Sequence, residues 1–145
     1  MGVLRTPGRG LIQRISKTIT FTGAAGVGAV GAVPIWTVTG EVLVIALVPF
    51  CTVLLTEAAP TATLALGVTG STSLFVAATT GTAIDANEFW VDTAPDANGI
   101  ALPAALKDIA ITDNIIGTVA AQAVDSGAIR FDLLWVGLSS DGLVA

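Results

Sequence analysis

The feature that most constrains this chain is a succession of short runs rich in β-branched residues, each bounded by a turn signal. Gly, Pro, Asn and Asp stand between the runs, as in Asn98-Gly99 and Asp113-Asn114, and these residues favour tight turns. Only 103–107 looks helical, and no apolar stripe with helical spacing is long enough for a helix bundle. The candidate strands are 17–22, 35–48, 51–57, 62–68, 73–79, 88–92, 108–112, 115–123 and 128–138. This pattern predicts an all-β chain that forms a sandwich or a barrel.

Two of the candidate strands, 35–48 and 128–138, become apolar on both faces toward their ends. In each, a face that begins with polar residues continues with large aliphatic ones, and Gly40 is a plausible bend in the first. Large exposed apolar patches are unusual on monomers, so a partner subunit or a second sheet layer has to cover these faces. We expect a homo-oligomer interface, and the alternative is a second sheet within the domain. The residues concerned are Leu43, Ile45, Leu47, Leu134, Val136 and Leu138.

Charge divides the chain into two parts. Four of the six basic residues, Arg5, Arg9, Arg14 and Lys17, lie in the first 17 residues, and all eleven acids follow them. A basic segment ahead of an acidic body commonly binds an acidic partner, and a solvated tail is the alternative. The whole chain has 145 residues, a length typical of one domain. We therefore predict an extended basic N-terminal arm over 1–17 and a single β-sandwich domain over 18–145.

The composition argues against an enzyme and against a bound metal or cofactor. The chain has no His and one Cys, which removes the side chain that normally titrates near neutral pH and any Cys-based zinc site. Carboxylates cluster in 85–98, where calcium or sugar chemistry is the alternative to ordinary turn formation, but the spacing matches no EF-hand. The stretch 26–31 fits G-x-G-x-x-G, yet it leads to Pro34 and a strand. We predict no catalytic, metal or cofactor-binding residues.

The sequence also argues against a membrane or a nucleic acid as a partner. The longest apolar run, Val42–Leu55, has only 14 residues, and it is interrupted by Pro49. A membrane-spanning helix needs about 20 residues. The basic leader is too sparse and too poor in aromatic residues for nucleic-acid recognition. We expect neither kind of partner, and a membrane-embedded protein is the alternative because the mean hydropathy is +0.84.

The order of several sequence strings resembles a class of small structural proteins from tailed-phage virions. These strings span most of the chain, and a basic leader precedes them. They read Thr18-Ile-Thr-Phe-Thr-Gly-Ala-Ala-Gly, Trp36-Thr-Val-Thr-Gly-Glu-Val-Leu-Val, Thr63-Leu-Ala-Leu-Gly-Val, Ile84-Asp-Ala-Asn-Glu-Phe-Trp, Leu102-Pro-Ala-Ala-Leu-Lys and Ala128-Ile-Arg-Phe-Asp-Leu-Leu-Trp.

The resemblance extends to capsid decoration (cement) proteins, which are often jelly rolls and often trimers. It implies a jelly-roll-like sandwich on the virion capsid surface, with the major capsid protein and further copies of itself, as a trimer, for partners. The basic residues at 5, 9, 14 and 17 would contact the capsid. The class provides no catalytic or metal residues. The alternative is a head-fibre base or a tail-tip or receptor-binding module that makes contacts through the loops of 85–98.

Overall fold

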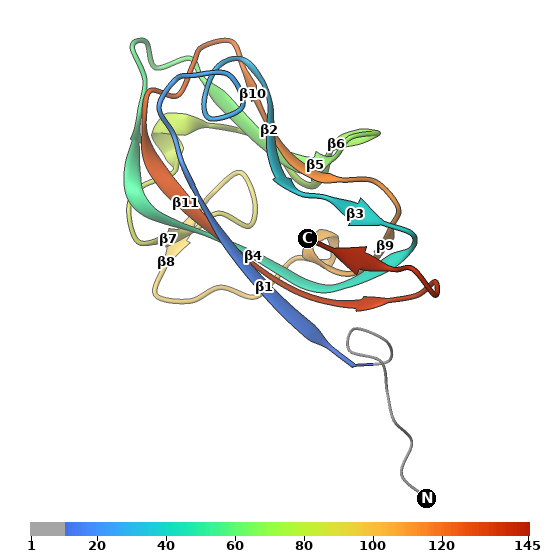
Figure 1. Cartoon of the computed structure of the whole chain (residues 1–145). Helices are drawn as coiled ribbons and strands as arrows, with labels where there is room; N and C mark the ends of the chain where they lie inside the picture. The colour runs from blue at the N-terminus through green and yellow to red at the C-terminus, as the bar shows by residue number, and fades with distance from the viewer. Residues whose placement is uncertain (1–10) are drawn as a thin grey trace, which may run out of the picture.

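A computed structural model describes residues 11–145 of the chain as two antiparallel sheets packed face to face (Figure 1). The six-stranded sheet begins with the neighbouring strands β1 (Gln13–Thr20), β11 (Ser126–Gly137) and β4 (Val42–Thr56). On its other side, β4 pairs with both β7 (Glu88–Phe89) and β9 (Lys107–Ile111). The short strand β8 (Asp96–Ala97) pairs with β7. The four-stranded sheet runs β2 (Gly31–Trp36), β10 (Ile115–Ala120), β5 (Thr63–Val68), β6 (Ser71–Thr80). A third pair joins β3 (Val38–Thr39) to β12 (Leu143–Val144), and two 3-10 turns are Gly81–Ala83 and Ala104–Leu106.

The chain crosses repeatedly between the two main sheets. Strands β1, β4, β9 and β11 lie in one sheet and β2, β5, β6 and β10 in the other, so nearly every long connection changes sheet. The first long strand, β1, pairs with the last long strand, β11. This is the strand arrangement of a jelly roll. The prediction of an all-β sandwich of this type is confirmed.

The core fills the space between the sheets. Leu47 and Leu133 come from one sheet, Leu66 and Ile115 come from the other, and all four are fully buried. The long loop after β6 adds a buried Trp90. Burial of large aliphatic and aromatic side chains is the main source of stability for such a sandwich, at about 1.5–3 kcal/mol for each one.

The buried indole of Trp90 has a specific polar partner. Its N–H donates to the hydroxyl oxygen of Thr79 on β6 at 2.9 Å, and that hydroxyl donates to the Ala77 carbonyl at 2.9 Å. A buried polar group without a partner is costly, so this pair fixes the loop onto the sheet. Trp36 and Trp135 are buried as well, so all three tryptophans belong to the core.

The predicted strand 35–48 is not continuous. It breaks between β2, β3 and β4, and Gly40 turns the chain with a φ of 64°. A Cβ added at Gly40 would meet the Asp141 carboxylate and the Ser139 hydroxyl, and the φ lies in the left-handed region, so glycine is favoured there. The expected bend at Gly40 is confirmed, and the expectation of one long strand is wrong because the short β3 leaves the sheet to pair with β12.

The Gly- and Ala-rich segment 23–33 is a close backbone crossing followed by the start of β2. Gly28 has a φ of 130°, and a Cβ there would overlap the carbonyl oxygen of Val124. The Val124 N–H donates to the Gly28 carbonyl at 2.8 Å. The low side-chain volume of this segment therefore lets two loops at one end of the sandwich touch backbone to backbone.

Candidate functional site

Five of the predicted interface residues lie on one surface, the outer face of the six-stranded sheet. In the register, Leu134 on β11 stands opposite Arg14 on β1, and Val136 stands opposite Leu43 on β4. Directly paired residues share a face of the sheet. Leu134 is 37% exposed, and Leu138, which follows β11, is also exposed. We call the residues Leu43, Ile45, Leu134, Val136 and Leu138 the apolar strip.

Leu47 does not belong to this strip, and its prediction as an interface residue is wrong. A β-bulge between the pairs Leu134–Ala46 and Trp135–Val44 leaves Ile45 without a partner on β11. An extra residue in a strand exchanges its two faces beyond that point. Leu47 therefore pairs with Leu133 and is fully buried in the core.

The first strand begins earlier than predicted. β1 starts at Gln13 and pairs with β11 along its whole length, so 13–17 belong to the sheet and not to a separate arm. This segment pairs with β11 because every second residue faces the core, as Gln13, Ile15 and Ile19 do. Arg5 and Arg9 lie outside the described residues. Arg14 lies on the outer face with its side chain 67% exposed.

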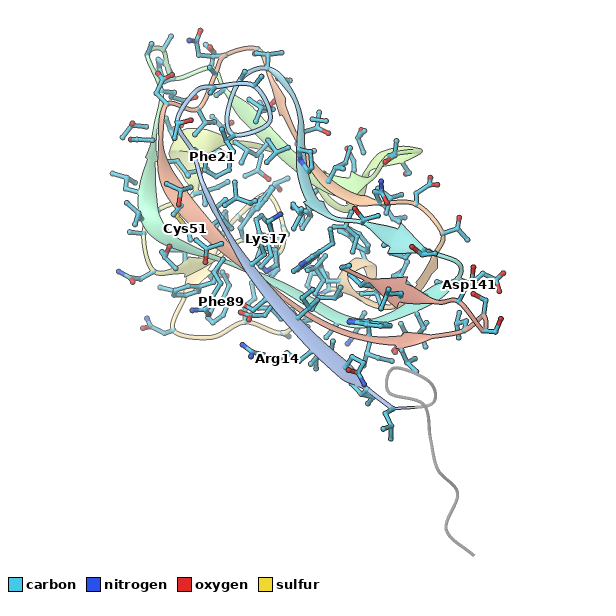
Figure 2. All side chains as sticks on the ribbon, viewed as in Figure 1. Arg14, Lys17, Phe21, Cys51, Phe89 and Asp141 are labelled. Atoms are coloured by element: carbon cyan, nitrogen blue, oxygen red, sulfur yellow. The ribbon has the colours of Figure 1, made fainter. Side chains whose placement is uncertain are left out.

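Lys17 makes a contact within the chain that the sequence does not reveal. Its ammonium group donates to the Ile35 carbonyl oxygen of β2 at 2.9 Å, from one sheet to the other. Figure 2 labels Lys17 on β1. The register of β2 against β10 shifts at this point and leaves Ile35 without a partner in the ladder. Lys17 thus joins β1 and β2, which are edge strands of opposite sheets.

Three charged side chains from β1 and β11 form a cluster on the outer face, near the β1 edge of the sheet. Asp132 accepts hydrogen bonds from Arg14 at 2.9 Å and from Arg130 at 2.8 Å. Partial burial alone would raise the pKa of Asp132, but hydrogen bonds from Ser16 and Arg130 and the charges of both arginines outweigh it, so the pKa lies below its usual value. The Arg130 guanidinium also lies 5.2 Å from the centre of the Phe50 ring. The cluster carries one net positive charge.

Charge is distributed unevenly over the described residues. Strands β1, β4 and β11 contain three of the four cations and one of the eleven acids of 11–145. The remainder of this region has one cation, Lys107, and ten acids. Strands β1 and β11, at one edge of the six-stranded sheet, are therefore the basic part of an otherwise acidic body.

Four of the acids gather at the β7–β8 end of that sheet. Glu88 accepts a hydrogen bond from the Asp85 N–H at 3.0 Å, and Asp92 accepts one from the Ala94 N–H at 2.7 Å. These bonds are the turn chemistry that the sequence suggests. Asp96 on the edge strand β8 is exposed. Within residues 11–145, no group of three or more His, Cys, Asp or Glu side chains is placed to hold a metal ion.

The single cysteine, Cys51, is buried in the core, where desolvation raises the pKa of its thiol to about 11. Cys51 is therefore a small core residue.

Across 11–145 the structure contains no helix that is long and apolar enough to cross a membrane.

Comparison with known proteins shows a shared fold. No protein-family model matches the chain, and no curated protein matches it. A chain in the solved structure entitled "Cyanophage Pam1 capsid asymmetric unit" has a similar fold, with a TM-score of 0.54 and 19% sequence identity. The match covers 93% of this chain and 93% of that one, so the two chains are nearly equal in length. The likeness therefore extends over the whole sandwich.

Proposed function

We propose that this protein is a structural component of a phage virion that decorates the capsid as a homo-oligomer. The observation that carries the proposal is the likeness, over 93% of both chains, to a chain from a cyanophage capsid asymmetric unit. A small jelly roll of the same length is the kind of unit that can be added to a shell in many copies. The major capsid protein is the proposed partner, and the capsid surface is the proposed location.

The surface chemistry suits a contact protein that carries out no reaction. The apolar strip leaves Leu134 and Leu138 exposed, next to the Arg14–Asp132–Arg130 cluster. An apolar centre with charged surroundings is typical of protein interfaces. Each exposed ion pair contributes only about 0–1 kcal/mol, so stabilisation of the shell would arise from many contacts made together. In this role the protein bridges capsomers and strengthens the head against internal pressure.

The test is binding to purified phage heads that lack the protein. Heads and protein are sedimented together, and the bound copies per head are counted as the protein concentration rises. We expect saturation at a fixed number of copies and a head that withstands more heating. Absence of binding to heads, or binding to tails instead, would contradict the proposal and favour a tail-tip module.

The basic leader is tested by charge removal. Replacing Arg5 and Arg9 with Gln should weaken binding to heads because an acidic capsid surface would lose two attractive charges. Replacing Lys107, a cation on β9, with Gln should have little effect, and Arg9→Gln alone is the leader variant that matches this control in charge. Equal losses in both proteins would show that general charge, and not the leader, sets the affinity.

A further inference from the structure

The six-stranded sheet has oppositely charged edges. One edge is the basic strand β1. The opposite edge is formed by the acidic β7–β8 region and, farther along β4, by β9. Arg14 is exposed at the first edge, and Asp96 is exposed at the second (Figure 1 labels the strands). Within residues 11–145, β1 pairs with no strand other than β11, so the backbone on its outer side has no strand partner there.

The basic edge also carries exposed apolar surface. Ile12, directly before β1, is 63% exposed, and Leu134 beside β1 belongs to the apolar strip. Exposed edge strands are natural sites for pairing with another chain. Apolar residues beside such an edge supply affinity, while charges determine which partner fits and in which orientation.

The charges select a second copy in one orientation. Outside β1, β4 and β11, the described body has ten acids and one cation, so two copies repel each other over most of their surfaces. A symmetric contact between two β1 edges would bring together two surfaces whose Arg14–Asp132–Arg130 clusters each carry a net positive charge. The acidic β7–β8 edge of another copy, in contrast, offers opposite charge.

We propose that copies of this protein associate head to tail, with the β1 edge and the apolar strip of one copy against the β7–β8 edge of the next, so that Arg14 faces Asp96. This inference rests on the proposed function as a homo-oligomer and specifies the surfaces that meet. A contact between two different surfaces repeats from copy to copy and closes into a ring when the rotation permits. A ring of this kind presents the same faces of every copy to a shell.

Charge reversal tests the contact. Arg14→Glu and Asp96→Arg should each raise the dissociation constant of the oligomer by at least about tenfold, because like charges then face each other. The double variant Arg14→Glu/Asp96→Arg restores opposite charges in reversed positions and should recover most of the affinity. Molar mass is measured by light scattering and sedimentation over a range of concentrations, and circular dichroism checks that each variant retains its strands.

One control makes a charge change away from both edges. Asp125→Arg in the loop before β11 should leave the oligomer unchanged. Arg14→Gln, which adds no negative charge beside Asp132, should weaken association less than Arg14→Glu. The proposal is overturned if the wild-type chain stays monomeric at tens of micromolar, or if the double variant associates no better than the single ones.

Head binding is measured separately for the same proteins. A wild-type protein that forms the oligomer but fails to bind heads would refute the proposed function and leave the head-to-tail contact intact. If the protein binds heads but the charge reversals leave its self-association unchanged, the head-to-tail contact is refuted and the proposed function stands. The two ideas therefore fail through different observations.

Discussion

Two leucine-to-alanine substitutions on neighbouring strands test which face of β4 and β11 belongs to the core. Leu47 is fully buried, whereas Leu134 is 37% exposed on the outer face. Leu47→Ala removes three buried carbon groups at about 0.8 kcal/mol each and leaves a cavity. We expect its free energy of unfolding to fall by about 3 kcal/mol.

Leu134→Ala should cost the isolated subunit much less. A partly exposed site on a sheet face leaves no enclosed cavity, and surface substitutions usually change stability by about 0.5 kcal/mol or less. We expect a loss below about 1 kcal/mol in the monomer, together with weaker self-association because Leu134 lies in the apolar strip.

The assay is urea unfolding followed by tryptophan fluorescence at a protein concentration where the chain is monomeric. Unchanged slopes with shifted midpoints would show that stability alone has changed. A loss below 1 kcal/mol for Leu47→Ala, or a larger loss for Leu134→Ala than for Leu47→Ala, would refute the face exchange at the β-bulge. Strict alternation along β4 would then be the better description.

Three further predictions follow from individual contacts. Lys17→Met should lower the free energy of unfolding by about 1 kcal/mol in urea titrations, because the Ile35 carbonyl loses its donor while the aliphatic stem remains; no loss would contradict the link between the sheets. Since burial raises the pKa of the Cys51 thiol to about 11, an aromatic disulfide reagent at pH 8 should label Cys51 only after unfolding, and rapid labelling of the folded protein would refute its burial. Because the pKa of Asp132 is lowered in the folded state, its stabilising contribution is present above the ordinary Asp value of about 3.9 and is lost as pH falls through the lower folded value. Asp132→Asn should therefore flatten the acid limb of the stability–pH curve, and an unchanged limb would contradict this cause.

Strand content and fold class were accessible from the sequence because they depend on local patterns. Turn residues such as Asn98-Gly99 and Asp113-Asn114 separate the strands, and the candidate strand 62–68 forms β5 almost where expected. The burial of the three tryptophans follows in the same way from their apolar neighbours. Local chemistry was sufficient for these features.

Features that depend on distant pairing were not accessible. The bulge at Ile45 exists only in the register of β4 against β11, so the alternation that placed Leu47 outside was correct only up to that residue. Likewise, the early start of β1 depends on its pairing with a strand more than a hundred residues away. The contact of Lys17 with the Ile35 carbonyl required both sheets to be in place.

The candidate surface was predicted in part. The sequence identified the apolar strip, but it gave no indication that β1 and the β7–β8 region occupy opposite edges of one sheet. That arrangement results from jelly-roll topology, in which strands adjacent in space are remote in the chain. Charge polarity across a sheet therefore becomes visible only once the strand order is known.

The most direct measurement of the central claim is electron cryomicroscopy of phage heads incubated with the purified protein. The account predicts jelly-roll density at regular positions on the outer surface of the head, in rings of copies related by rotation. Heads that show no added density, or particles that carry the protein only on the tail, would contradict it.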